Sequence, residues 1–220
     1  MDGVIVDSEP YHYEVESIIF DRLGISIPDE ERHTFIGKAS DKLWSHIRKT
    51  YQLPQSVDEL LQFDRSVRLD YMASREEIAA IPGVVDLLND LTEHGVKRAL
   101  ASSSSIDLIT LFIEKLKLGS YFSIIVSGDF VERGKPDPDI FTYTARQLKE
   151  EPSKCVVIED STNGIRAAKA AGMPCIGFRN PGSKGQDLSG ADYIIDDMRS
   201  LTYHRVKKIH AAAHEQPCNL

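Results

Sequence analysis

Four short polar segments of the chain carry side chains suited to handling a phosphate group and a metal ion. They are Asp2-Gly3, the serine run that begins at Ser102, Lys135 in a loop, and the acidic pair Glu159-Asp160. Carboxylate oxygens are the ligands that hard divalent cations prefer. A hydroxyl and backbone N–H groups at a helix start bind phosphate, and a lysine adds positive charge. Together these residues predict phosphoryl transfer, in which positioning and electrostatic stabilisation supply most of the catalysis.

Each segment also has an ordinary structural explanation when it is considered alone. Asp-Gly is a common turn pair, and a serine before a helix is typically a cap. A lysine between glycine and proline is commonly an exposed loop charge, and acids before a helix complement its dipole. We favour the catalytic interpretation because all four ordinary explanations would otherwise have to coincide.

The elements around these segments indicate a parallel sheet that would bring them to one edge. After Ile81-Pro82-Gly83, short apolar strands alternate with longer helical patterns, which is typical of right-handed crossovers. We expect strands at 98–101, 123–126, 155–158, 174–177 and 193–195, and helices at 84–93, 106–116, 138–148 and 162–171. In a doubly wound sheet, ligands bind beyond the carboxyl ends of the strands, where Ser102 and Glu159-Asp160 would lie.

The residues before this alternation predict a separate helical body. Apolar residues three and four apart indicate amphipathic helices, and Pro10 suits a first helical turn. These helices are expected at 10–23, 40–51 and 57–73. We therefore predict an α/β fold: a doubly wound Rossmann-like parallel sheet formed by 1–9 and 77–202, an inserted α-helical cap domain at 10–76, and a C-terminal tail at 203–220.

The charge composition of the chain limits the kinds of molecule that it is expected to bind. The chain has 34 acidic and 26 basic side chains and a formal charge of −8, which argues against general binding of nucleic acid or anionic membranes. Its apolar stretches fall far short of the roughly 20 residues that span a bilayer, and an acid follows Met1 where a secretory signal would carry positive charge. The three cysteines form no CxxC pair, so we expect reduced thiols, a cytoplasmic location and, by default, a monomer.

The polar segments carry four motifs that occur in the same order in a known superfamily. The segment 1–10 resembles the first motif of the haloacid dehalogenase-like hydrolases, 101–104 the second, 134–138 the third and 157–164 the fourth. Pro82-Gly83-Val84 also matches the usual return from the cap. The similarity covers residues 1 to about 200 and is greatest to the phosphatase and β-phosphoglucomutase branch.

This resemblance implies a Mg²⁺-dependent enzyme that passes through an aspartyl-phosphate, which divides one difficult displacement into two easier ones. Ser102 and the amide of Ser103 would hold the phosphoryl oxygens, and Lys135 would neutralise them. Asp160 would bind Mg²⁺ directly, and Glu159 directly or through water.

The first family motif reads Asp-x-Asp-Gly, and its first aspartate is the nucleophile. Asp2 matches the second aspartate, the general acid and base, whose backbone carbonyl also binds the metal. Met1 takes the middle position, so the nucleophile would lie immediately before Met1 on a central strand. Without that strand, neighbouring strand edges stay unpaired, and a free amino group at Met1 would weaken metal binding. We therefore expect the functional protein to extend upstream, and the 220-residue chain alone to be an impaired enzyme or a binding relic.

Cap residues bear on the choice between hydrolysis and isomerisation. His12 falls where the mutase branch places a histidine that assists proton transfer, and it fits a polar helix face equally well. Gly37 and Lys38 resemble the substrate loop of the cap, but Ser40 stands where the mutase has an arginine that grips phosphate. No clear match to the mutase's cap lysine occurs near Val67, and Lys38 would replace the arginine only as a point charge. We therefore predict a phosphatase for a small phosphorylated metabolite such as a sugar phosphate, with a β-phosphoglucomutase-like isomerase as the alternative.

The tail contains a histidine pair that the catalytic interpretation does not use. His210 and His214 are four residues apart, a spacing that puts zinc ligands on one helix face. No acid or second pair of ligands is placed in the sequence to complete a zinc site there.

Overall fold

The computed structural model describes residues 1–33, 40–183 and 185–215. The chain divides into two compact units. Met1–Glu9 and Glu77–Leu220 form one, here called the core unit, and Pro10–Glu76 form the other, here called the helical unit. That the helical unit serves as a cap stays a prediction. No helix within the described ranges is long and apolar enough to cross a membrane.

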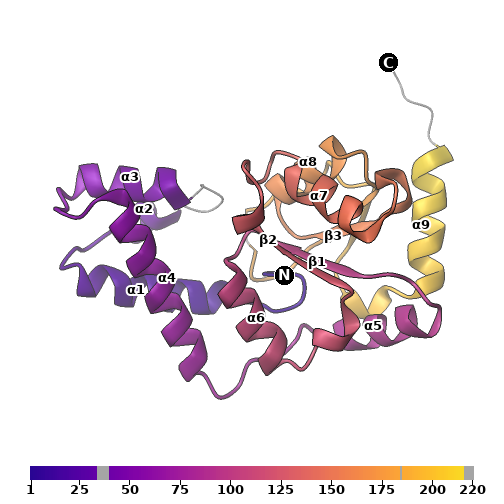
Figure 1. Ribbon diagram of the computed structural model, residues 1–220, viewed down its shortest axis with the longest axis horizontal. Helices are drawn as coiled ribbons and strands as arrows, with labels where there is room; N and C mark the ends of the chain where they lie inside the picture. Colours follow the sequence, from indigo (N-terminus) through magenta and orange to yellow (C-terminus); the bar gives the residue numbers. More distant parts are fainter. Residues whose placement is uncertain (34–39, 184, 216–220) are drawn as a thin grey trace. The chain divides into compact units, whose positions relative to one another are not determined.

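The core unit contains parallel strands in two sheets (Figure 1). The first sheet pairs β1 (Ala99–Ser102) with β2 (Ile124–Ser127). The second has the order β3 (Val157–Glu159), β4 (Cys175–Phe178) and β5 (Tyr193–Ile195). The five predicted strands are all present, and the Rossmann-like α/β fold is confirmed. The two sheets agree with the unpaired strand edges expected without a central strand before Met1, although periodicity alone does not indicate which strands are neighbours.

Helices cover both faces of these strands. They are α5 (Val84–Glu93), α6 (Ile106–Lys115), α7 (Asp139–Leu148), α8 (Thr162–Ala170) and α9 (Tyr203–Glu215). In Figure 1, α7 and α8 lie above the strands, and α5 and α6 lie below them. The apolar face of α7 packs on β1 and β2, and that of α8 packs on β3 and β4. Covering of both faces explains why the strands are almost continuously apolar.

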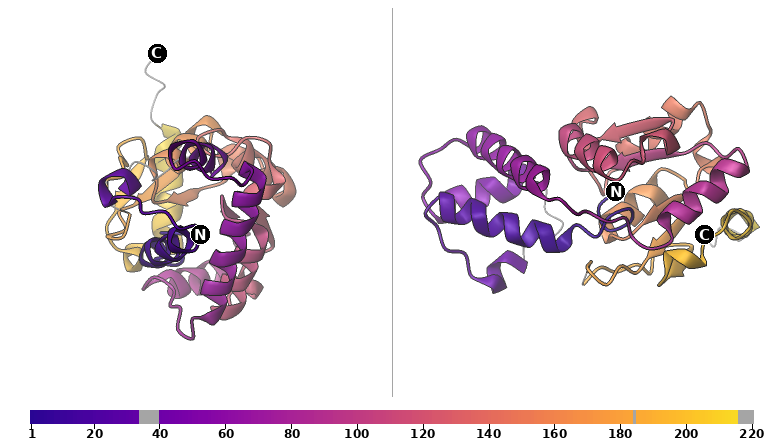
Figure 2. Two further views of the ribbon diagram at one scale, coloured as in Figure 1. Left: turned by 90° about the vertical axis from the view of Figure 1, so that its left-hand side faces the viewer. Right: turned by 90° about the horizontal axis from the view of Figure 1, so that it is seen from below.

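The segment expected as a tail forms helix α9 over the whole of its described length. Helix α9 packs beside α5, as Figures 1 and 2 show. Ile209 of α9 is buried. The short 3₁₀ helix η3 (Pro152–Lys154), which precedes β3, also contacts α9 through its backbone.

The helical unit consists of α1 (Glu9–Arg22), α2 (Asp29–His33), α3 (Ser40–Thr50) and α4 (Val57–Ser74). The regularly spaced apolar residues that predict three of these helices also form their common core. Its buried members include Val15, Ile19, Trp44, Ile47, Leu60 and Val67. Ser56 and Glu59 form a reciprocal capping box at the start of α4. The five-residue α2 was not predicted, because it has too few turns to show a periodic pattern.

A cavity of about 610 Å³ lies between the two sheets of the core unit. Its walls include Leu100 and Ala101 of β1, Val157 and Ile158 of β3, and Met1. Among the described residues, β1 pairs only with β2 and β3 only with β4. Each sheet therefore presents one unpaired edge toward an apolar cavity.

Candidate active site

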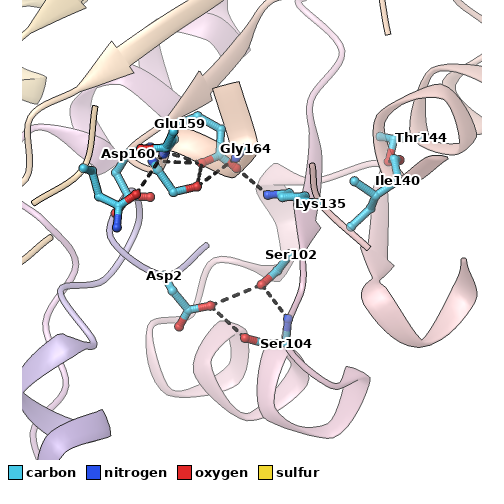
Figure 3. A network of polar contacts seen from close by, with 12 residues as sticks. Asp2, Ser102, Ser104, Lys135, Ile140, Thr144, Glu159, Asp160 and Gly164 are labelled. Carbon is cyan, nitrogen blue, oxygen red and sulfur yellow. Dashed lines mark hydrogen bonds and ion pairs between the residues drawn. The ribbon is translucent and has the colours of Figure 1, made fainter. Parts of the chain in front are cut away.

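The predicted polar segments meet at the carboxyl ends of the strands (Figure 3). Ser102 ends β1, Glu159 ends β3, and Asp160 follows it directly. The amino group of Met1 is buried where the charges of Asp2, Lys135, Glu159 and Asp160 all act on it. Burial lowers the pKa of this amino group, against the opposing effect of the three carboxylates. Segments more than 150 residues apart in sequence thus form one polar site.

The Asp2 carboxylate is held by serine hydroxyls. Ser8 donates a hydrogen bond to Oδ1 at 2.8 Å. Ser102 and Ser104 donate to Oδ2 at 3.2 and 2.8 Å, as Figure 3 shows. Ser104 also donates its backbone N–H to the Ser102 hydroxyl at 3.2 Å. Sequence analysis did not assign roles to Ser8 and Ser104, although both lie inside the matched motifs. The phosphate contact of the Ser103 amide stays a prediction.

A glycine permits the start of the chain to approach Asp160. Gly3 has φ +65° and its backbone N–H bonds the Val6 carbonyl at 2.8 Å. A Cβ atom at Gly3 would lie 1.8 Å from Oδ2 of Asp160. The left-handed conformation and the close approach both require the absence of a side chain.

Lys135 and Glu159 form a buried ion pair, with side chains that are 11% and 8% exposed. Burial by itself would raise the pKa of Glu159. The charge and hydrogen bond of Lys135, with the Met1 amino group and the Ser161 hydroxyl, together outweigh burial, so the pKa is lowered. The second oxygen of Glu159 accepts the hydroxyl and backbone N–H of Ser161 at 3.0 and 3.3 Å. A Cβ atom at Gly164 would overlap this carboxylate, so the first turn of α8 also needs glycine.

The pKa of Asp160 shifts in the direction opposite to that of Glu159. Burial, followed by the negative charge of Glu159, raises its pKa to about 6. The Ser183 hydroxyl donates a hydrogen bond to Oδ2 of Asp160. Ser183 was missed by sequence analysis, because it lies in an irregular polar loop with no spacing that relates it to Asp160.

The donor chemistry of this group fits a hard divalent cation. Asp160 and Glu159 place two buried carboxylates together beside Lys135. Oxygen donors of this kind suit Mg²⁺, which usually keeps several waters and few protein ligands. Within the described ranges, no three His, Cys, Asp or Glu side chains converge as a complete metal site. The metal roles of Asp2, Glu159 and Asp160 therefore stay predictions.

The remaining predicted residues belong to the helical unit. Gly37 and Lys38 lie outside the described residues, and Ser40 is an exposed residue at the start of α3. His12 Nδ1 lies 3.3 Å from Nη1 of Arg68. Because a guanidinium only donates, Nδ1 of His12 is the acceptor in this contact. Sequence analysis found no lysine match near Val67, whereas the structure shows that Arg68, the next residue, supplies a cation beside His12.

Comparison with known proteins gives a consistent result. A family model described as haloacid dehalogenase-like hydrolase matches residues 1–178. The chain is 30% identical over 223 residues to a phosphoglycolate phosphatase of Shigella boydii, covering 91% of this chain and 88% of that protein. It is 32% identical over 204 residues to a bifunctional riboflavin kinase/FMN phosphatase of Arabidopsis thaliana. That match covers 91% of this chain but 52% of the relative, so the chain spans about half of that protein's length.

A solved structure extends the similarity to three dimensions. CbbY from Rhodobacter sphaeroides, crystallised as a mutant with xylulose-(1,5)bisphosphate, matches with a TM-score of 0.81 and 26% identity. The match covers 91% of this chain and 93% of that one.

Proposed function

Because the chain belongs to the haloacid dehalogenase-like hydrolase family, we propose that it uses Mg²⁺ to hydrolyse the phosphoric monoester of a small phosphorylated metabolite, such as a sugar phosphate. Its phosphatase relatives support hydrolysis. The observation that carries the proposal is that Asp2, Lys135 and the Glu159-Asp160 pair surround the buried Met1 amino group, with Ser102 hydrogen-bonded to Asp2. The free thiols of Cys155 and Cys175 support the cytoplasmic location predicted from the sequence.

We assign the binding of the phosphate group to Ser102 and Lys135. The Ser102 hydroxyl would turn from Asp2 to a phosphoryl oxygen, while Ser8 and Ser104 continue to hold the Asp2 carboxylate. Lys135 would share its charge between Glu159 and the phosphate. Asp160, Glu159 and the Asp2 carbonyl would hold Mg²⁺, which supplies positive charge against the charge that develops on the transferred oxygens.

Asp2 would carry the proton in both half-reactions. In the first, the P–O bond to the leaving group breaks as an aspartate nucleophile attacks phosphorus, and Asp2 protonates the departing oxygen. In the second, Asp2 takes a proton from a water molecule, which attacks phosphorus and releases phosphate from the aspartyl-phosphate. The hydroxyls of Ser8 and Ser104 fix the direction in which this carboxylate presents its oxygens.

We propose that the nucleophile is the residue immediately before Met1, on a strand that occupies the cavity between β1 and β3. The family motif supports this position for the nucleophile. The unpaired edges of β1 and β3 support the strand, because one parallel strand between them would hydrogen-bond to both edges. Such a strand would replace the buried amino group of Met1 with a peptide bond, so that this ionisable group would no longer lie beside the expected cation.

The test compares the 220-residue chain with a chain extended upstream to include the strand and its aspartate. Phosphate release is measured on a panel of phosphate monoesters, with Mg²⁺ and with EDTA. We expect the extended protein to be active only with Mg²⁺, and replacement of the upstream aspartate by asparagine to reduce kcat by roughly 10⁴-fold or more. In Asp160→Asn, added Mg²⁺ should no longer increase the rate of phosphate release. The exposed Asp187→Asn should respond to Mg²⁺ as the parent does.

Different results overturn different parts of the proposal. Equal activity of the short and extended chains overturns the upstream nucleophile. Full activity in EDTA overturns the role of Mg²⁺. An extended, folded protein that releases no phosphate from any monoester overturns the phosphatase assignment.

One observation favours a second function. Arg68, held by Asp64 at 2.9 Å, places a cation beside His12, and a mutase needs cations that hold a second phosphate. A β-phosphoglucomutase-like enzyme would convert β-glucose 1-phosphate to glucose 6-phosphate faster than it releases phosphate. Measuring both products from this substrate separates the two functions.

A further inference from the structure

Two histidines of α9 and one backbone carbonyl converge on a point outside the candidate active site. Nε2 of His210 and Nε2 of His214 each lie 2.8 Å from the carbonyl oxygen of Ser153. The two nitrogens are 3.2 Å from each other. Ser153 belongs to η3, 57 and 61 residues before the histidines, so the convergence results from the fold and not from the helix alone.

Hydrogen bonds alone satisfy the two imidazole nitrogens and the Ser153 carbonyl oxygen poorly. A carbonyl oxygen only accepts, so each imidazole must carry its proton on Nε2 to bond Ser153. Two N–H groups would then point at one oxygen from nitrogens that are 3.2 Å apart. If either ring is the other tautomer, a nitrogen lone pair faces the oxygen lone pairs instead. A cation at the centre would satisfy all three electron-pair donors at once.

The distances suit a small transition-metal ion. Ligand atoms about 2.1 Å from one ion, at angles of roughly 90–110°, lie roughly 2.9–3.4 Å apart. The separation of 3.2 Å between the two imidazole nitrogens falls within this range, and the 2.8 Å contacts to oxygen lie just below it. The rings are inclined at 72° to each other, so both nitrogens can face a common centre without stacking of the rings.

We propose that His210, His214 and the Ser153 carbonyl oxygen form a binding site for a divalent transition-metal ion of the zinc type, with water at the remaining positions. Imidazole nitrogen selects Zn²⁺, Cu²⁺ and Ni²⁺ over Mg²⁺ and Ca²⁺, which prefer oxygen. The site therefore differs in chemistry from the carboxylate group around Asp160. Sequence analysis lacked the third ligand, because a backbone carbonyl brought in by η3 has no sequence signature.

The position of the site gives the ion a structural effect. His210 is half-buried and His214 is exposed, so the ion would reach the site from solvent. A metal bound here would join α9 to η3, the element that leads into β3. An ion that binds only the folded state stabilises it in proportion to the logarithm of its concentration. Zinc should therefore slow the local opening of α9.

The test is calorimetric titration of the intact chain with zinc chloride in a large excess of Mg²⁺, which occupies oxygen sites. We expect one equivalent of Zn²⁺ to bind the wild type and that equivalent to be lost in the His210→Ala/His214→Ala double variant. The matched control is His204→Ala on the same helix, which should keep the equivalent. All three proteins have the same cysteines and carboxylates, so binding at other ligands cancels in the comparison.

A second readout separates the site from general surface binding. Hydrogen exchange of α9 amides should slow on addition of Zn²⁺ in the wild type and in His204→Ala, but not in the double variant. Far-UV circular dichroism checks that all three are folded. Equal zinc binding by the wild type and the double variant, or unchanged exchange of α9 in the wild type, would overturn the proposal.

Discussion

Replacing Asp160 with asparagine should stabilise the core unit in the absence of metal. Burial and the charge of Glu159 raise the pKa of Asp160 from 3.8 to about 6. Between these values the folded chain keeps a proton that the unfolded chain has released, so stability falls as the pH rises through this window. Each pKa unit corresponds to 1.36 kcal/mol, so the charged form of Asp160 costs the folded state about 3 kcal/mol at pH 7.5. Asparagine has nearly the same shape and carries no charge.

The assay is urea unfolding followed by far-UV circular dichroism, with EDTA, between pH 4 and pH 7.5. We expect Asp160→Asn to be about 3 kcal/mol more stable than the wild type at pH 7.5, with the difference falling toward zero near pH 4. Saturating Mg²⁺ should also remove the difference, because the cation stabilises only the wild-type carboxylate. Trp44 fluorescence is unsuitable here, because the only tryptophan lies in the helical unit.

Asp187→Asn provides the matched control. Hydrogen bonds from the backbone and side chain of Ser189 lower the pKa of this exposed carboxylate, so its replacement should give no gain at any pH. The reasoning is refuted if Asp160→Asn is less stable than the wild type at pH 7.5, or if its gain is the same at every pH. Either result would mean that shape or hydrogen bonding, and not buried charge, decides the energetics of this site.

Three further perturbations test other parts of the structure. Lys135→Met should destabilise the chain by roughly 3–5 kcal/mol at pH 7.5, measured by urea unfolding, because Glu159 keeps a buried charge without its partner; the loss should shrink at pH 5 as that carboxylate takes up a proton. Ser56→Ala removes the hydroxyl of the capping box and should cost the helical unit about 1 kcal/mol, measured by tryptophan fluorescence, and Ser56→Asn should restore most of it. Burial raises the pKa of the Cys175 thiol to about 12. In a variant whose other two cysteines are serine, this thiol should therefore not react with Ellman's reagent at pH 8 until urea unfolds the chain. Rapid reaction of the folded variant would contradict the burial of Cys175.

The sequence predicts the elements of this fold better than their pairing. Helices and strands are visible because apolar residues repeat with the period of each element, and parallel strands place Ser102 and Glu159 at one edge by geometry. The pairing of strands depends on contacts between distant segments, and periodicity contains no information on them. The family motif predicts unpaired strand edges without a strand before Met1, but the strands that form each sheet were identified only in the structure.

The site shows the same limit at the level of single side chains. Asp2, Lys135 and Asp160 are identifiable because their motifs have fixed order and residue type. Ser183 is not, because one serine in a polar loop has no distinguishing pattern, and its contact with Asp160 exists only after folding. Arg68 was overlooked for a different reason, since a search for lysine near Val67 does not find the arginine that occupies the next position.

The apolar cavity between β1 and β3 has a consequence for the response of the chain to compression. The space between side chains such as Leu100 and Ile158 is not filled by protein atoms, so the core is less densely packed there than a typical protein interior. Unfolding eliminates that volume, and hydrostatic pressure favours whichever state occupies less. The chain should therefore unfold at a lower pressure than a relative of equal thermal stability whose interior is filled.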